Sequence, residues 1–315
     1  MSHLQAAVEQ YLALRRSLGF ELREAEATLN AFVAFAQAEG ASFITTNLVL
    51  RWTQQPSKIQ SATWAARVSM VRCFATWRSA TDPRTEIPPE RLVPCRYVRT
   101  PPYIYSDDEI ARLLAVTRKL PSAKGLRGAT YATFFALLAA SGMRMREALA
   151  LDQRDVDLGE GVLTIRRTKF RKSRLVPVHP TTRDALEKYA ERRAALVGGA
   201  GRPAFFVSER GARISQWSTR YTFAKVSSHI GLRAPFKGSQ HGHGPRLHDL
   251  RHRFAVTTLI DWYRAGVDVE REMPKLAAYL GHTHIHDTYW YIEAVPELLQ
   301  LAAERLTANR KEGAR

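Results

Sequence analysis

The feature that most constrains the fold is a proline-rich stretch, residues 83–102, that interrupts the chain after its first helical segments. Proline lacks a backbone N–H and disfavours helix in the residue before it, so this stretch is expected to be extended. It contains Pro83, Pro88, Pro89, Pro94, Pro101 and Pro102, interspersed with Arg84, Arg91, Arg96 and Arg99. The sequence therefore predicts a semi-rigid basic linker between two domains. Two domains are also what a chain of 315 residues is expected to form.

Before the linker, apolar residues recur at helical spacing and show no strand-like alternation. The predicted helices cover about 4–19, 23–39, 46–52 and 61–79. Residues 1–82 are therefore expected to form an N-terminal helical bundle. The fourth of these helices carries three arginines that either contact phosphates or form a solvated polar face, namely Arg67, Arg72 and Arg78.

The pattern after the linker is mixed. Ser106 and the acidic residues that follow it predict a helix start, and 129–141 reads as a buried helix. Two short runs rich in β-branched residues, 162–165 and 175–178, predict an antiparallel hairpin among further helices. We therefore expect a mainly α domain with a small β component (α+β) over 103–295, followed by a C-terminal helix and basic tail over 296–315.

Charge points to the class of partner. The formal net charge is +17, of which residues 1–99 contribute only +4, from twelve lysines and arginines against eight acidic residues. Such an excess is costly unless a polyanion offsets it, so double-stranded DNA is the leading partner. The predicted hairpin concentrates this charge in six cations without an acid: Arg166, Arg167, Lys169, Arg171, Lys172 and Arg174. No signal peptide, membrane span or disulfide framework is expected, which favours a bacterial cytoplasmic, nucleoid-associated protein.

Imidazoles, a guanidinium and phenols gather between His248 and Tyr291. This inventory suits an anionic phosphate and a phenolic nucleophile. Upstream, Arg144 follows the glycine that ends the buried helix, and Glu147 stands three residues further on. Arg144 and Glu147 form either a surface ion pair or a fixed cation that awaits a phosphate.

These pieces together resemble the tyrosine recombinase, or phage integrase, family. The matching segments are Ser141-Gly142-Met143-Arg144 with Glu147, the lysine hairpin, His248-Asp249-Leu250-Arg251, Leu280-Gly281-His282 and Tyr291. They occur in the family's order over about 150 residues. The N-terminal bundle carries no motif but is similar in size to the family's core-DNA-binding domain.

The resemblance implies roles for individual residues. Tyr291 attacks the scissile phosphate to form a 3′-phosphotyrosyl intermediate, and Lys169 protonates the departing 5′ oxygen. Arg144 and Arg251 hold the non-bridging oxygens. His248 and His282 assist by hydrogen bonding and proton transfer, and Glu147 supports the site. DNA backbone contacts are expected from Arg67, Arg72, Arg166, Arg167, Arg171, Lys172 and Arg174.

Elementary chemistry agrees with these roles. A phenol with a pKa near 10 needs activation, and fixed guanidinium groups match the charge of a pentacoordinate phosphate. The pattern favours Tyr291 over Tyr289, Lys169 over Lys172, and Arg144 over Arg146. We expect no metal and no cofactor, because neither a P-loop nor a carboxylate cluster is present and the histidines at 282 and 286 lack completing ligands.

The sequence therefore predicts a site-specific recombinase or integrase, serving integration, excision or transposition of a mobile element. It is expected to act as a homo-oligomer, with a dimer on each site and a tetramer in the synapse, or as a hetero-oligomer with related recombinases. A type IB-like topoisomerase and a non-catalytic DNA-binding factor derived from a recombinase are the alternatives. The C-terminal helix packs either on its own domain or on a neighbouring protomer.

Overall fold

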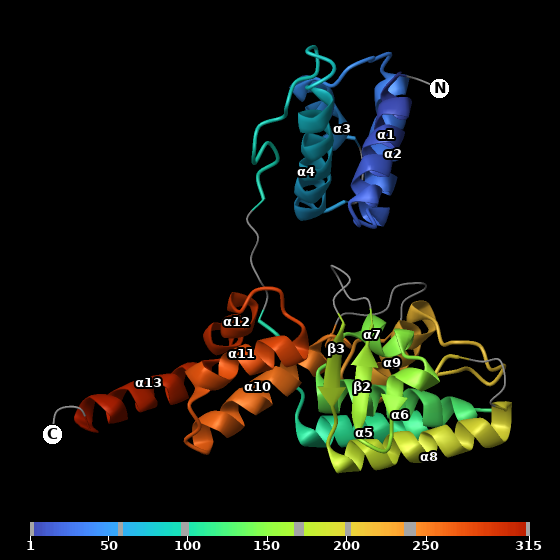
Figure 1. Ribbon diagram of the computed structural model, residues 1–315, viewed down its shortest axis with the longest axis vertical. Helices are drawn as coiled ribbons and strands as arrows, with labels where there is room; N and C mark the ends of the chain where they lie inside the picture. The colour runs from blue at the N-terminus through green and yellow to red at the C-terminus, as the bar shows by residue number, and fades with distance from the viewer. Residues whose placement is uncertain are drawn as a thin grey trace. The chain divides into compact units, whose positions relative to one another are not determined.

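A computed structural model describes residues 3–55, 59–95, 101–166, 173–198, 203–235 and 244–312, with side chains up to 307. The chain divides into two compact units, Met1–Thr100 and Pro101–Arg315, each described by itself below (Figure 1). No helix among these residues is long and apolar enough to cross a bilayer.

The first unit is a bundle of four helices close to the predicted ranges. They are α1 (His3–Ser17), α2 (Arg23–Ala38), α3 (Thr46–Thr53) and α4 (Ser61–Arg78). Aromatic rings fill its core, where Trp52 packs edge-on against both Phe32 and Trp64, with ring centroids 5.1 and 5.0 Å apart. This burial of aromatic surface holds the bundle together.

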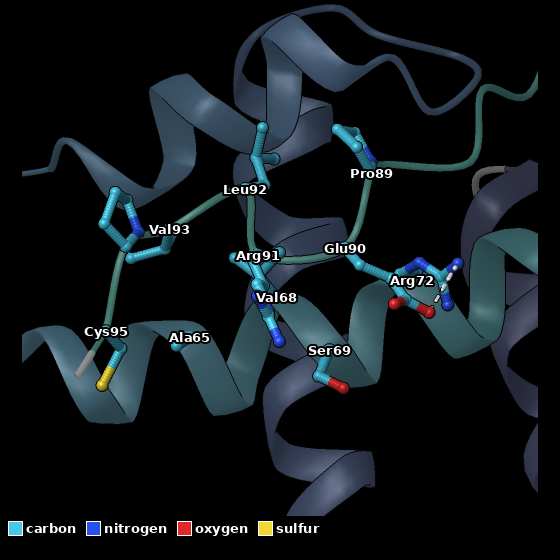
Figure 2. Close-up of a pocket in the computed structure, with 11 residues that line it drawn as sticks. Ala65, Val68, Ser69, Arg72, Pro89, Glu90, Arg91, Leu92, Val93 and Cys95 are labelled. Atoms are coloured by element: carbon cyan, nitrogen blue, oxygen red, sulfur yellow. Dashed lines mark ion pairs between the residues drawn. The ribbon is translucent and has the colours of Figure 1, made fainter. Parts of the chain in front are cut away.

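The proline-rich stretch does not behave wholly as a linker. The Glu86 N–H donates to the Ile44 carbonyl at 2.8 Å, and the Glu86 carboxylate accepts from the Thr46 N–H at 2.7 Å. Leu92 and Val93 pack against the bundle core. Figure 2 shows residues 89–95 running along α4, from the Arg72 end toward the Ala65 end, and together with α4 they line a hollow of about 490 Å³. Much of the stretch therefore belongs to the first unit, which extends to Thr100 rather than ending at residue 82.

The second unit is built around α6 (Leu126–Ser141), which is buried along most of its length and contacts α5, α8 and α10. The first helix, α5 (Asp107–Arg118), begins with a capping box formed by Ser106 and Glu109. The remaining helices are α7 (Met145–Ala150), α8 (Pro180–Val197), α9 (Gln216–His229), α10 (Asp249–Arg264), α11 (Val269–Leu280), α12 (His286–Ala294) and α13 (Pro296–Glu312), with a 3-10 turn at Gln153–Asp155.

A three-stranded antiparallel sheet supplies the β component. Its strands, in order, are β1 (Val156–Asp157), β2 (Val162–Ile165) and β3 (Arg174–Pro177). Val162 pairs with Pro177 and Ile165 with Arg174, so the predicted hairpin is formed. Its turn, 167–172, lies outside the described residues. The predicted class, mainly α with a small β component, is confirmed.

The C-terminal helix α13 begins on its own unit. Leu298 is fully buried in a cluster with residues of α10 and α12, and Arg264 pairs with Glu297 at 2.8 Å. Further along α13, the Arg305 guanidinium donates to the Val267 carbonyl, whereas Leu306 is 64% exposed. The first turns of α13 therefore pack in cis.

Candidate active site

The site begins where α6 ends. Gly142 caps this helix with φ +59°, in the left-handed region that suits glycine, and it lies against Phe254 and Leu280. The chain then turns so that Arg144 becomes the N-cap residue of α7. This sharp turn aims Arg144 and the Gly142 carbonyl at the start of α10 and the end of α11.

The Glu147 carboxylate holds the side chains of Arg144 and Arg174 in place. One of its carboxylate oxygens accepts the Arg144 N–H and the other accepts the Arg144 guanidinium, both at 3.0 Å. Arg174 donates to the same two oxygens at 2.9 and 2.7 Å. Burial by itself would raise the pKa of Glu147, but these hydrogen bonds and positive charges lower it below the ordinary value. Glu147 is therefore an ionised anchor for two arginines.

Arg174 differs from its prediction as a DNA-backbone contact. Its side chain is only 14% exposed, its guanidinium grips Glu147, and its Nε donates to the Tyr279 carbonyl at 2.9 Å. Ile165 pairs with Arg174 at the end of the β2–β3 ladder that adjoins the turn, and the contacts with Glu147 and Tyr279 direct the Arg174 side chain toward the site. Arg174 therefore belongs to the structure of the site, and a spacing argument could not distinguish it from Arg166, which is about half exposed.

Arg251 is the second predicted phosphate-binding cation, and it is buried. One Nη donates to the carbonyls of Gly142 and Leu280, at 2.8 and 2.9 Å. The other Nη has no hydrogen-bond partner among the described residues. Burial, and then the charge of Arg144, lower the pKa of Arg251 to about 10, while Tyr291 acts in the opposite direction. An anion would satisfy both the unpaired N–H groups and the concentration of charge.

Arg144 completes the cationic pair. It donates to the Gly281 carbonyl at 2.8 Å while its side chain remains 39% exposed. Gly281 caps α11 with φ +72°, and the same turn delivers His282. The carbonyl ends of α6 and α11 thus hold the two guanidinium groups side by side.

Tyr291 lies on α12 and is 2% exposed. Its hydroxyl forms a hydrogen bond with Nδ1 of His252, at 3.1 Å. The His282 ring stacks near Tyr291 at 6.4 Å between centroids, and its Nδ1 meets the Thr288 hydroxyl at 2.7 Å. The phenol, two histidines and the buried arginine are therefore gathered in one place.

His248 is the N-cap residue of α10, and its ring meets that of His252, four residues later, edge to face with centroids 4.7 Å apart. The sequence motifs assigned His252 no role in the site. Its spacing of four residues from His248 was the available signal, because that spacing shares one helix face.

Tyr289 stands two residues before Tyr291 on the same helix, so its side chain points about 200° away around the axis. Tyr289 is half-buried and lies close enough to Tyr263 to raise the pKa of that residue, although burial is the larger cause. The geometry thus favours Tyr291 over Tyr289 as the phenol that faces the cations.

The other predicted DNA-binding residues divide into three groups. Arg166 is about half exposed and pairs with Asp155, and Arg67 lies over the Trp64 ring at 5.2 Å. Arg72 donates to the Pro88 carbonyl at 3.0 Å and pairs with Glu90 at 3.4 Å, so the proline-rich segment holds it (Figure 2). The third group, Arg167, Arg171 and Lys172, lies outside the described residues, as does Lys169, the predicted proton donor.

Arg78, the third arginine of α4, is buried rather than available to DNA phosphates. Its side chain is 8% exposed, and it donates to Asp82 at 3.3 Å and to Thr81 at 3.1 Å. Its charge stabilises the end of α4. Neither of the two interpretations of this residue, a phosphate contact or a solvated face, fits its position.

Two guanidinium groups, one with an Nη unpaired within the part of the chain that the structure describes, lie near a phenol that is hydrogen-bonded to an imidazole. This arrangement can bind a phosphodiester and present a nucleophile to it. Within the described residues, no group of three or more His, Cys, Asp or Glu side chains could hold a metal ion. His241 and His243 lie outside those residues.

Comparison with known proteins gives consistent results. A model of the phage integrase family matches residues 104–297. The chain is 46% identical to a putative integrase/recombinase, y4rB, of Sinorhizobium fredii, over 97% of this chain and 98% of that protein. It is 29% identical to tyrosine recombinase XerC of a Roseiflexus species, over 73% and 68% of the two chains. The fold resembles that of the Tn1549 transposon integrase, solved with transposon right end DNA, with a TM-score of 0.66 at 13% identity over 98% of this chain and 100% of that one.

Proposed function

Since the chain belongs to the phage integrase family and is a site-specific recombinase, we propose that it cleaves and rejoins DNA through a 3′-phosphotyrosyl intermediate on Tyr291. The observation that carries this proposal is that Tyr291 lies near His282, while the end of α11 just before His282 holds Arg251, a buried guanidinium with an Nη unpaired among the described residues. A scissile phosphate seated there receives charge-assisted hydrogen bonds and meets the nucleophile.

The reaction divides among the residues as follows. Arg144 and Arg251 bind the non-bridging oxygens and stabilise the pentacoordinate transition state, and Glu147 keeps Arg144 in place. His248 and His282 assist with hydrogen bonds and proton transfer near the phosphate. Lys169, which lies between β2 and β3 in the sequence, protonates the 5′ oxygen as it leaves. The phosphotyrosyl bond conserves the energy of the phosphodiester, so rejoining needs no nucleotide.

The partner is double-stranded DNA, because the second unit alone carries a formal charge of +13. We propose a dimer on each site and a tetramer when two sites exchange strands, either of this chain alone or together with related recombinases. The biological role is movement of a mobile element by integration, excision or transposition. The similarity to a putative integrase/recombinase along nearly the whole chain supports this role.

The test is capture of the covalent intermediate. Labelled DNA fragments that flank the coding sequence are incubated with the protein and resolved on a denaturing gel. The wild type should give a protein–DNA adduct, and Tyr291→Phe should give none. Tyr289→Phe is the matched control, because this phenol lies on the opposite side of α12, and the variant should still form the adduct.

Three outcomes contradict parts of the proposal. An adduct formed by Tyr291→Phe shows that another residue is the nucleophile. Binding by the wild type without an adduct on any fragment indicates a non-catalytic DNA-binding protein. Relaxation of supercoiled plasmids that lack all flanking sequences indicates topoisomerase activity instead of site-specific exchange.

A further inference from the structure

Building on the proposed function, we propose that Arg253 is a positioning residue for cleavage. It binds residues 103–107 to α10 and thereby keeps Arg251 where the scissile phosphate is held. Residues 103–107, here called the entry segment, follow the prolines at 101 and 102 and end on the first residue of α5. Arg253 lies two residues after Arg251 on α10, and the roles implied by the family resemblance do not include it.

The entry segment occupies the guanidinium of Arg253. The Arg253 Nε donates to the Tyr105 carbonyl at 2.9 Å, and one Nη pairs with the Asp107 carboxylate. The side chain of Arg253 is 16% exposed, whereas that of Asp107 is 95% exposed. An ion pair with an exposed carboxylate contributes little, so the bond to the carbonyl of the buried Tyr105 is the main attachment. Arg253 therefore connects two segments of the second unit and is not a free cation for DNA.

Two further contacts hold the entry segment against the start of α10. The Tyr105 hydroxyl donates to the carbonyl of Arg246, just before the helix, at 3.2 Å. Burial, and then the charge of Asp249, raise the pKa of Tyr105, so its phenol keeps the proton that it donates. Ile104 packs against the apolar cluster formed by residues of α10, α11 and α12. The entry segment is therefore attached to the same stretch of chain that carries the site residues.

The first turns of α10 are held from two sides. On one side, Arg251 donates to the carbonyls of Gly142 and Leu280. Phe254, three residues later on the same helix face, lies against Gly142. Arg253 is offset from Arg251 by about 200° around the helix axis, so it binds the opposite neighbour, the entry segment. The position of α10 is thus set by α6 and α11 on one side and by the entry segment on the other.

Loss of the attachment through Arg253 should displace Arg251 without removing it. A misplacement of about 1 Å caused by a substitution away from the reacting atoms can slow a reaction on the order of 10²-fold. Arg251 acts through its charge, which stabilises the negative charge that a phosphate gathers in the transition state. A variant of Arg253 should therefore lose rate to the extent that the scissile group is charged. This dependence on substrate charge distinguishes positioning of Arg251 from a general loss of stability.

The experiment compares two DNA substrates with the same protein sample, after the scissile bond has been located from the wild-type adduct. One carries the ordinary phosphodiester, and the other a methylphosphonate, in which a methyl group replaces a non-bridging oxygen and removes one negative charge. Arg253→Gln should slow single-turnover adduct formation about 10–100-fold on the phosphodiester and less than about threefold on the methylphosphonate. Arg251→Ala is the reference variant and should show the same selective loss on the phosphodiester.

The ratio of the two rates in one sample does not depend on the fraction of protein that is folded. Arg112→Gln is the matched control, because Arg112 pairs with Asp108 at 2.9 Å beside the same acidic turn but is 50% exposed. It should leave both rates within about twofold of the wild type. Arg253→Lys keeps the charge but replaces the planar fork by one ammonium, so its phosphodiester rate should lie between those of the wild type and Arg253→Gln. The affinity of Arg253→Gln for DNA, measured by fluorescence anisotropy, should match that of Arg112→Gln.

Three results would overturn the assignment. Equal losses on the two substrates would show that Arg253 supports only the stability of the fold. Wild-type rates on both would show that it has no part in cleavage. A loss of DNA affinity as large as the loss of rate would make Arg253 a DNA contact. Failure of the proposed function appears differently, as the absence of an adduct from the wild type on the ordinary substrate.

Discussion

Glu147 shows how one carboxylate controls the charge of the site. It holds Arg144 and Arg174 through four contacts while its own side chain is 8% exposed. Two guanidinium groups left without this anion would repel each other in a poorly solvated place. Glu147 therefore stabilises the fold as well as the arrangement of the cations.

We expect Glu147→Gln to lower the free energy of unfolding by about 3 kcal/mol at pH 7. The pKa of Glu147 is lowered in the folded chain, so its contribution is complete above the ordinary value of 4.5 and is lost as the pH falls through the folded pKa. Denaturant unfolding at pH 7 and at acid pH should therefore show the gap between wild type and variant narrowing below pH 4.5.

The control for this prediction is Glu160→Gln, an exposed carboxylate beyond β1, which should change the unfolding free energy by less than about 0.5 kcal/mol. A gap for Glu147→Gln that stays constant from neutral to acid pH would show that the Glu147 charge does not hold the arginines.

At the residue scale, motif spacing predicted the gathering of Arg144, Glu147, Arg251, His282 and Tyr291, and the structure brings these five together. It did not predict the contacts of His252 or the inward turn of Arg174. Both depend on where a side chain points after the helices and strands have packed, which spacing along one element does not determine.

At the scale of elements, the end of α6 is the critical junction. Gly142 has φ +59°, and a Cβ there would lie 2.6 Å from a Phe254 ring carbon and 3.0 Å from a Leu280 methyl. Its carbonyl also accepts from Arg251. The packing of α6, α10 and α11 therefore converges on one residue that has no side chain.

We expect Gly142→Ala to lower the free energy of unfolding by about 2–4 kcal/mol, from left-handed backbone strain together with overpacking, and to slow cleavage by displacing Arg251. Gly266→Ala is the matched control, because φ is +69° there but a Cβ meets nothing within 4 Å. It should lose only about 1 kcal/mol, the backbone cost alone. Equal losses in denaturant unfolding would show that the contacts with Phe254 and Leu280 do not matter.

Local signals predicted most of the helices and the hairpin, since periodicity and capping residues act over a few positions. They failed for the proline-rich stretch, whose attachment to the first unit depends on Glu86 reaching Ile44 and Thr46, about 40 residues earlier. The start of α13 likewise packs in cis through the buried Leu298, a choice that its amphipathic pattern left open.

At the scale of the whole molecule, charge is unevenly divided between the two units. The second unit carries 35 lysines and arginines against 22 acidic residues, and the first carries a net charge of +4. Each phosphate that a protein neutralises releases condensed counterions, which makes the affinity depend on salt. We expect the affinity for DNA to fall by about 10³ or more between 50 and 200 mM salt, as measured by fluorescence anisotropy.

Substitution of a cation between β2 and β3 tests which part of the chain makes the DNA affinity depend on salt. Arg167→Gln should reduce the slope of log affinity against log salt by about 1, as loss of one phosphate contact predicts. Arg23→Gln, at a position 87% exposed in the first unit, should leave the slope unchanged. A flat salt dependence for the wild type would contradict backbone binding altogether.

The buried guanidinium of Arg251 limits how the stability of such an enzyme can evolve. Its desolvated guanidinium, with a pKa lowered to about 10, destabilises the chain without DNA, and in the proposed mechanism the scissile phosphate satisfies it. The substrate thus acts as a missing piece of the core, and ligand binding contributes to folding. Selection for a more stable fold in the absence of DNA would favour loss of this charge. Folding stability and catalysis therefore make opposite demands on the Arg251 side chain.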